Sequence, residues 1–197
     1  IISREEMTIE EAKSKVFAIP GVGTSAYLSL RLALGDVDYK VVPFDEIMPS
    51  VKSGQYDVGV IIHEGQLTWK DEGVNLVLDL GIWWNEKTGL PLPLGGNVVR
   101  KDLGLEMCGK ITDDVKNSIE HSLSNPEDAL KFAKEWGRGI DDDTNEEFVG
   151  MYVNKRTLDY GDDGREAIRL FLKKGQEIGM VRSDLEVDSI VFVGSGE

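Results

Sequence analysis

The first third of the chain alternates short apolar runs with helical patterns, and this alternation limits the folds open to it. Apolar runs at residues 16–19, 39–44 and 58–62 predict strands, and residues 24–34 and 45–52 between them have helical patterns. Crossovers between parallel strands in this βαβαβ order are right-handed. The run at 58–62 contains no polar side chain, which is typical of a strand buried on both faces of a parallel sheet. The pattern therefore predicts an α/β fold.

Near residue 100 the sequence pattern changes from alternating strands and helices to helices alone. A fourth strand is predicted at 74–80, and alternating prolines followed by glycines at 90–96 favour an extended segment that crosses between two lobes, with a strand resuming at 97–100. Helical patterns follow, at residues 105–123, from Pro126 to Gly137, at 145–154 and at 165–178. We expect residues 4–97 to form an α/β lobe and residues 98–197 to form the mainly helical, incomplete remainder of the other lobe.

Composition excludes several classes of partner. The 197 residues have a net charge of −14, which argues against nucleic acid and anionic lipid because both need a basic face. No run of eighteen apolar residues exists, so no membrane span is predicted. Cys108 is the single cysteine and is predicted to be a buried structural thiol, and His121 is predicted to be exposed to solvent. Two separated histidines and one cysteine predict no zinc site.

The start of the chain has its own pattern. Ile1-Ile2-Ser3 has the character of the tail of a strand, and Thr8-Ile9-Glu10-Glu11 then begins a helix. Because the chain does not begin with methionine, we expect it to lack an N-terminal segment, and the absence of a signal peptide says little about its location.

Three segments are predicted to meet where parallel strands end, which is the edge at which such sheets bind ligands. They are residues 21–26, 43–45 and 63–65. The first leads a glycine-rich turn into a helix, where free N–H groups and the helix dipole favour an anion and where Thr24 and Ser25 add hydroxyl donors. An ordinary Ser/Thr helix cap explains the same residues.

The same turn also fits a dinucleotide-binding fingerprint. Gly21 and Gly23, with Ala26 in the third glycine position, have its spacing, and Asp45 falls near the expected acidic position. Asp45 is equally well placed as the cap of the following helix. A nicotinamide-dependent oxidoreductase therefore stays open as an alternative function.

His63 ends an otherwise apolar strand at the ligand edge, next to Glu64 and Gly65. A neutral imidazole there suits a base that works near neutral pH. A core histidine is more often structural, but its place at this edge favours a functional role. For Glu64 two interpretations stay open: it orients His63 or binds polar groups of a substrate, or it is an exposed turn residue.

Three segments resemble the 1,4-dihydroxy-6-naphthoate synthase family: Ile-Ile-His-Glu-Gly-Gln-Leu-Thr at 61–68, Leu-Asp-Leu-Gly-x-Trp-Trp at 78–84 and Thr-Gly-Leu-Pro-Leu-Pro-Leu-Gly-Gly at 88–96. Shorter matches occur at residues 24–27, 152–154 and 158–159, so the resemblance covers nearly the whole chain. The first and third segments are specific in combination. The family begins with a further strand-rich stretch that this chain lacks.

The resemblance implies a type II periplasmic-binding-protein-like fold, with two lobes around a cleft, and a cytoplasmic enzyme. The family's lyase converts cyclic dehypoxanthine futalosine to 1,4-dihydroxy-6-naphthoate in menaquinone biosynthesis, releasing dihydroxyacetone. The resemblance implies that His63 is the catalytic base. It also implies that Ser25 and Ala26, with Thr24 beside them, bind the carboxylate of the small-molecule substrate. Glu64 is a candidate substrate contact. No metal and no cofactor are implied.

Two further readings of the same fold stay open. One is a non-catalytic solute-binding protein, in which a base-like histidine has no task. The other is chorismate dehydratase of the same pathway, which the His-Glu-Gly segment at 63–65 fits poorly. A homodimer also stays open.

Overall fold

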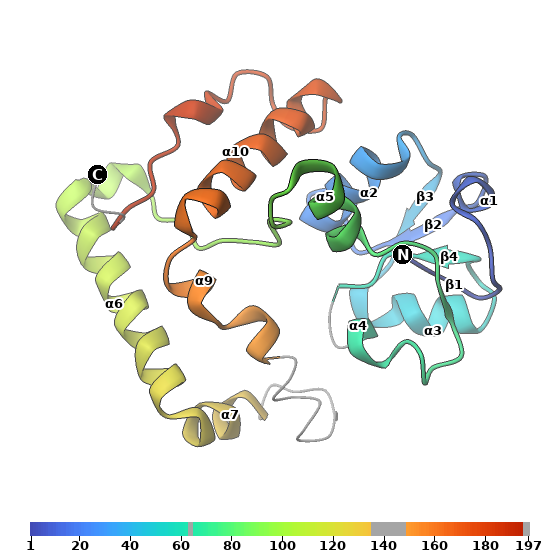
Figure 1. The fold of residues 1–197 in the computed structure, drawn as a ribbon, viewed down its shortest axis with the longest axis horizontal. Helices are drawn as coiled ribbons and strands as arrows, with labels where there is room; N and C mark the ends of the chain where they lie inside the picture. The colour runs from blue at the N-terminus through green and yellow to red at the C-terminus, as the bar shows by residue number, and fades with distance from the viewer. Residues whose placement is uncertain (63–64, 135–148, 195–197) are drawn as a thin grey trace. The chain divides into compact units, whose positions relative to one another are not determined.

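The computed structural model describes residues 1–62, 65–134 and 149–194, and the chain divides into two compact units (Figure 1). Unit 1 comprises Ile1–Leu94 with Ala167–Leu185, and unit 2 comprises Gly95–Glu166 with Glu186–Glu197. The predicted division into lobes at residues 97 and 98 stays a prediction. Among the described residues, no helix is long and apolar enough to cross a membrane.

Unit 1 is built on a mixed sheet whose strands, among the described residues, lie in the order β3-β2-β4-β1-β5. Their bounds are β1 Ile2–Ser3, β2 Phe17–Ile19, β3 Tyr39–Val41, β4 Val58–Gly59 and β5 Asn75–Leu76. β2 pairs in parallel with both β3 and β4, as the βαβαβ pattern predicts. β1 runs antiparallel to β4 and to β5. The α/β prediction is confirmed, with an antiparallel strand inserted in the sheet.

The four predicted strands that form are all shorter in the structure, β2 by one residue and β3 by three, and a fifth does not form. β4 covers two of the residues at 58–62, and β5 covers two of those at 74–80. The early end of β5 has a local cause: the Asp79 side chain accepts a hydrogen bond from the Ile82 N–H at 2.9 Å, and a helix begins at Leu80. Residues 97–100 form no strand, because they pair with no other strand among the described residues, and Val98 is 97% exposed.

The start of the chain occupies the interior of unit 1. β1 lies between β4 and β5, as expected for the tail of a strand. Ile1 is buried, and its carbonyl accepts a hydrogen bond from the Val77 N–H at 2.9 Å.

Helices cover the sheet of unit 1, and their bounds are α1 Ile9–Lys13, α2 Ser25–Leu34, α3 Ile47–Lys52, α4 Gly65–Thr68 and α5 Leu80–Thr88. Local signals place most of their starts. Thr8 and Glu11 form a capping box before α1, as the sequence predicts. The prediction that Asp45 caps a helix is wrong: Asp45 lies inside the 3-10 turn Phe44–Glu46, and α3 begins after that turn.

Several apolar clusters hold unit 1 together, and two of them involve α2. The first lies at the sheet and includes Phe17, Ile19, Leu30 and Val58, all fully buried. The second joins Leu28 of α2, Trp84 of α5 and Phe171. Phe171 belongs to α10, Gly161–Glu177, whose later part is counted with unit 1. The helices predicted at 24–34 and 165–178 form as α2 and α10.

Unit 2 is helical in its described part. It contains the 3-10 turns Lys101–Leu103 and Val187–Ser189, the helices α6 Leu105–Ser124, α7 Pro126–Lys134 and α9 Lys155–Leu158, and the first residues of α10. α6 and the start of α7 match their predictions, whereas the predicted end at Gly137 lies outside the described residues. Cys108 is 3% exposed and His121 is exposed, so both of these predictions are confirmed.

Candidate functional site

The candidate site is the amino end of α2, at the edge where the parallel strands of unit 1 end. β2 ends at Ile19, and the chain passes through a short turn into α2. The Ile19 carbonyl accepts a hydrogen bond from the Val42 N–H at 2.9 Å, which places the end of β3 at the same edge. Two of the three segments predicted to meet at this edge are therefore brought together.

Thr24 fixes the entry into α2. Its Oγ1 accepts a hydrogen bond from the Tyr27 N–H at 3.2 Å and donates one to the Gly21 carbonyl at 2.7 Å. Its own carbonyl accepts the first helical bond, from the Leu28 N–H at 3.1 Å. Thr24 thus closes the turn and caps the helix with one hydroxyl group.

The first two N–H groups of α2 are left for a ligand. Among the described residues, the backbone N–H groups of Ser25 and Ala26 have no hydrogen-bond partner, and both residues are partly exposed. They open a helix of 10 residues at the positive end of its dipole. This arrangement suits an anion such as a carboxylate.

The two hydroxyl groups at this helix end are already engaged. The Ser25 hydroxyl donates to the Leu94 carbonyl at 2.5 Å, and the Thr24 hydroxyl donates to the Gly21 carbonyl. A hydroxyl group carries one proton, so each donates one hydrogen bond at a time. In this structure the donors that remain for an anion are the two backbone N–H groups, and a direct role for either hydroxyl stays a prediction.

Residues 90–94, here called the strap, lie against α2 and α5, two helices that are neighbours in unit 1 (Figure 1). Side chains of these helices donate to strap carbonyls, in the pairs Asn85–Leu90 at 3.2 Å, Trp84–Pro91 at 3.1 Å and Ser25–Leu94 at 2.5 Å. Leu92 packs on the cluster around Trp84. The strap contains no helix and no strand, and the sequence did not reveal that it lies beside the amino end of α2.

His63 and Glu64 lie outside the described residues, so their predicted roles are not tested. The chain before them is placed by the Val60 N–H, which donates to the Ala18 carbonyl at 2.9 Å. After them, Gly65 is buried and opens α4. The role of His63 as base and that of Glu64 as substrate contact stay predictions.

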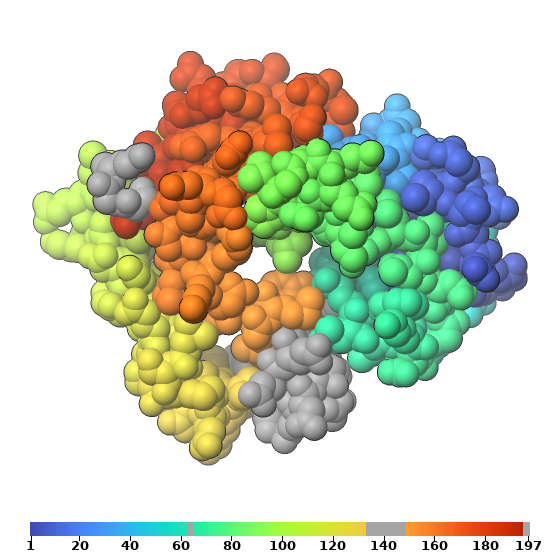
Figure 2. Space-filling model, in the orientation of Figure 1, coloured from blue at the N-terminus to red at the C-terminus, as the bar shows by residue number. Residues whose placement is uncertain are grey.

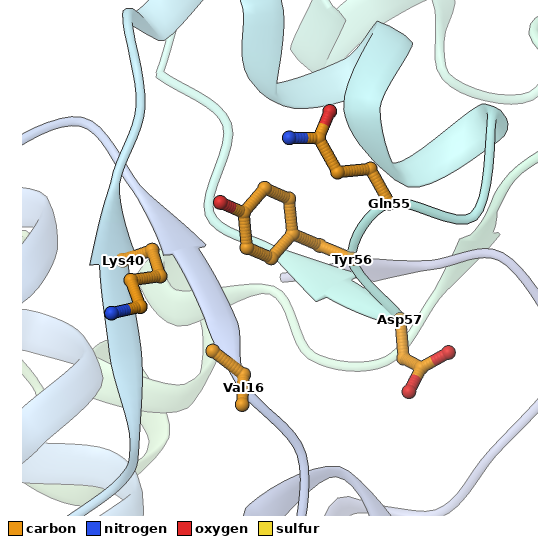
Figure 3. A pocket seen from close by; sticks show the side chains of 5 residues that line it. All are labelled: Val16, Lys40, Gln55, Tyr56 and Asp57. Carbon is orange, nitrogen blue, oxygen red and sulfur yellow. The ribbon is translucent and has the colours of Figure 1, made fainter.

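A separate pocket of about 310 Å³ lies elsewhere in unit 1 (Figure 3). Its lining residues are Val16, Lys40, Gln55, Tyr56 and Asp57. In Figure 3 the Tyr56 ring points toward the strand that carries Lys40, and the Asp57 carboxylate points away from it. Because Val16 and Asp57 directly precede β2 and β4, the pocket lies at the amino ends of these strands, opposite the α2 site. It contains none of the predicted site residues.

The described residues contain no group of three His, Cys, Asp or Glu side chains close enough to hold a metal ion.

Comparison with known proteins places the chain in a family. The family model described as menaquinone biosynthesis matches residues 1–177. A Streptomyces coelicolor protein named 1,4-dihydroxy-6-naphtoate synthase is 33% identical over 188 residues, which are 92% of this chain and 66% of that protein. A Thermus thermophilus protein of the same name is 40% identical over 156 residues, 78% of this chain and 57% of that protein.

A solved structure is also similar. The crystal structure of protein AF1704 from Archaeoglobus fulgidus superposes with a TM-score of 0.86 at 34% sequence identity, covering 91% of this chain and 67% of that one. The present chain spans 66% of the length of the Streptomyces coelicolor protein and 57% of the length of the Thermus thermophilus protein. With most of its length matched by the family model, the chain belongs to the menaquinone biosynthesis family.

Proposed function

We propose that the protein containing this chain is a carbon–carbon lyase that converts cyclic dehypoxanthine futalosine to 1,4-dihydroxy-6-naphthoate. Membership of the menaquinone biosynthesis family, with two similar proteins named 1,4-dihydroxy-6-naphtoate synthase, supports the activity. One observation of the site carries the proposal: two unpartnered N–H groups at the amino end of α2 suit the carboxylate of such a substrate.

The proposed reaction begins with removal of a proton. His63 acts as the base and takes a proton that a neighbouring carbonyl of the substrate makes acidic. The electron pair left on carbon drives cleavage of a carbon–carbon bond and makes the ring aromatic. The electron pair of the broken bond leaves with the three-carbon fragment, which takes the proton back from protonated His63 and departs as dihydroxyacetone. Ser25 and Ala26 hold the carboxylate through their N–H groups, with Thr24 fixing the turn, and this contact sets the orientation of the substrate. Glu64 is proposed to contact polar groups of the substrate.

The proposed fold is the two-lobed, type II periplasmic-binding-protein-like arrangement, with residues 4–97 in one lobe and 98–197 in the other. The mixed α/β sheet of unit 1 and the boundary between the compact units at Leu94 and Gly95 support it, whereas Ala167–Leu185 is counted with unit 1. A cytoplasmic location and a small-molecule substrate fit a biosynthetic enzyme of this family.

The test is product formation. The protein that contains this chain is incubated with cyclic dehypoxanthine futalosine, and 1,4-dihydroxy-6-naphthoate and dihydroxyacetone are measured by chromatography. We expect both products in equal amounts, and no turnover of chorismate in a parallel reaction. Binding of the substrate without turnover would favour a solute-binding protein, and consumption of chorismate would favour the dehydratase.

A further inference from the structure

We infer that Ser25 is a positioning residue: its hydroxyl fastens the end of the strap to the amino end of α2, and the substrate carboxylate is bound by the backbone N–H groups of Ser25 and Ala26 instead. The identity of the anion rests on the proposed function. The fastening of the strap does not, because it is a contact within unit 1.

The Ser25 hydroxyl has a single proton and can donate one hydrogen bond at a time. This proton is donated to the Leu94 carbonyl, across 69 positions of sequence. To donate to an anion, Ser25 would have to release this carbonyl, whose partial negative charge would then be left unpaired beside the anion. With the proton in place, the carbonyl is satisfied and the two N–H groups of α2 still face the ligand.

The strap offers few backbone donors. Pro91 and Pro93 have no N–H group, so the strap is held mainly through its carbonyls and apolar side chains. The bonds from α5 hold its first part at Leu90 and Pro91. Among the described residues, Ser25 alone donates to the last part, at Leu94.

This end of the strap lies at the surface. Leu94 is 54% exposed, and the green segment that includes α5 and the strap reaches the surface in Figure 2. Two glycines follow directly, and at Gly95 a side chain would meet no atom within 4 Å. Loss of the Ser25 hydroxyl would therefore free Leu94 while the bonds from α5 keep the first part of the strap in place.

The test compares Ser25→Ala with two matched variants in the intact protein. Ser25→Thr keeps a hydroxyl at the same position. Ser29→Ala makes the same change one turn later, where the Ser29 hydroxyl donates to the Ser25 carbonyl at 2.8 Å and does not touch the strap. The first readout is the NMR order parameter of the Leu94 amide, measured without ligand. Circular dichroism checks that each variant is folded.

In Ser25→Ala we expect this order parameter to fall from about 0.85, the value of rigid backbone, to below about 0.6. It should recover in Ser25→Thr and stay unchanged in Ser29→Ala. An unchanged value in a folded Ser25→Ala variant overturns the inference.

The second readout separates positioning from direct anion binding. The affinities for 2-naphthoate and for its neutral carboxamide are measured in the wild type and in Ser25→Ala. A positioning role predicts that both affinities change by the same factor. A tenfold or greater loss confined to 2-naphthoate would show that the hydroxyl itself binds the carboxylate, which contradicts the inference. If the wild type does not prefer 2-naphthoate to the carboxamide, the proposed anion site fails, whereas the order parameter still decides the role of the Ser25 hydroxyl.

Discussion

At the scale of single residues, two neighbouring hydroxyl groups at the start of α2 have different tasks: Thr24 caps the helix, and Ser25 donates to the Leu94 carbonyl. Thr8 and Thr24 were identified from sequence because a cap depends on neighbours within one turn. The bond from Ser25 to Leu94 has no such local signal, since its acceptor is a backbone carbonyl that any residue possesses. The sequence therefore predicted the helix end at which the anion site is proposed, but it did not predict the acceptor of the Ser25 hydroxyl.

The capping box of α1 gives a pH-dependent prediction. The Glu11 carboxylate accepts hydrogen bonds from the Thr8 backbone N–H at 2.7 Å and from the Thr8 hydroxyl at 2.8 Å, and these bonds hold the pKa of Glu11 below its usual value. Because the pKa is lower in the folded state, the stabilisation is fully present above the unfolded pKa and is lost as the pH falls through the folded pKa.

Urea unfolding of the wild type and of Glu11→Gln measures this effect. We expect the wild type to be the more stable at about pH 7, and its advantage to shrink by about pH 3, below the ordinary pKa of glutamate. Glu6→Gln is the control, since exposed Glu6 forms no hydrogen bond among the described residues. A wild-type advantage that is independent of pH would contradict this account of the cap.

At the scale of elements, helices were predicted better than strands. The pattern at 24–34 and at 105–123 gave α2 and α6 almost to the residue, because apolar spacing and caps act within one element. Strand length depends on the partner, and β1 pairs over only two residues with β4 and with β5. The Asp79 cap then ended the predicted strand at 74–80 before its last residue.

Trp84 connects three elements of unit 1 and gives the second prediction. Its side chain is 1% exposed, lies edge-on to Phe171 of α10 at 5.3 Å between ring centroids, and donates to the Pro91 carbonyl of the strap. We expect Trp84→Ala to lower the free energy of unfolding by about 3–5 kcal/mol through the cavity it leaves.

Chemical denaturation measures this loss, and two variants calibrate it. Trp84→Phe keeps an aromatic ring and removes the N–H donor, so its cost should be clearly smaller. Ile82→Ala lies on the same helix at a side chain that is 60% exposed, and its effect should stay within about 0.5 kcal/mol. Equal losses for Trp84→Ala and Ile82→Ala would contradict the packing role of Trp84.

At the scale of the whole molecule, the α/β class follows from the order of patterns along the chain, and the family follows from similarity over residues 1–177. The composition of each unit was harder to predict. Unit 1 includes Ala167–Leu185 from the far end of the sequence, because Phe171 packs with Leu28 and Trp84. A change in the sequence pattern indicates where the chain leaves one unit. It does not indicate which later segment of the chain packs into that unit again.

The central claim is that His63 is the base of a lyase, and the effect of removing its imidazole on product formation tests it most directly. The turnover number for conversion of cyclic dehypoxanthine futalosine is compared among the wild type, His63→Ala and His121→Ala, which removes the other histidine of the chain from an exposed position on α6. We predict that His63→Ala lowers kcat by about 10²- to 10⁴-fold, the usual contribution of a general base, and that His121→Ala leaves it unchanged. Undiminished turnover in a folded His63→Ala variant would contradict the account.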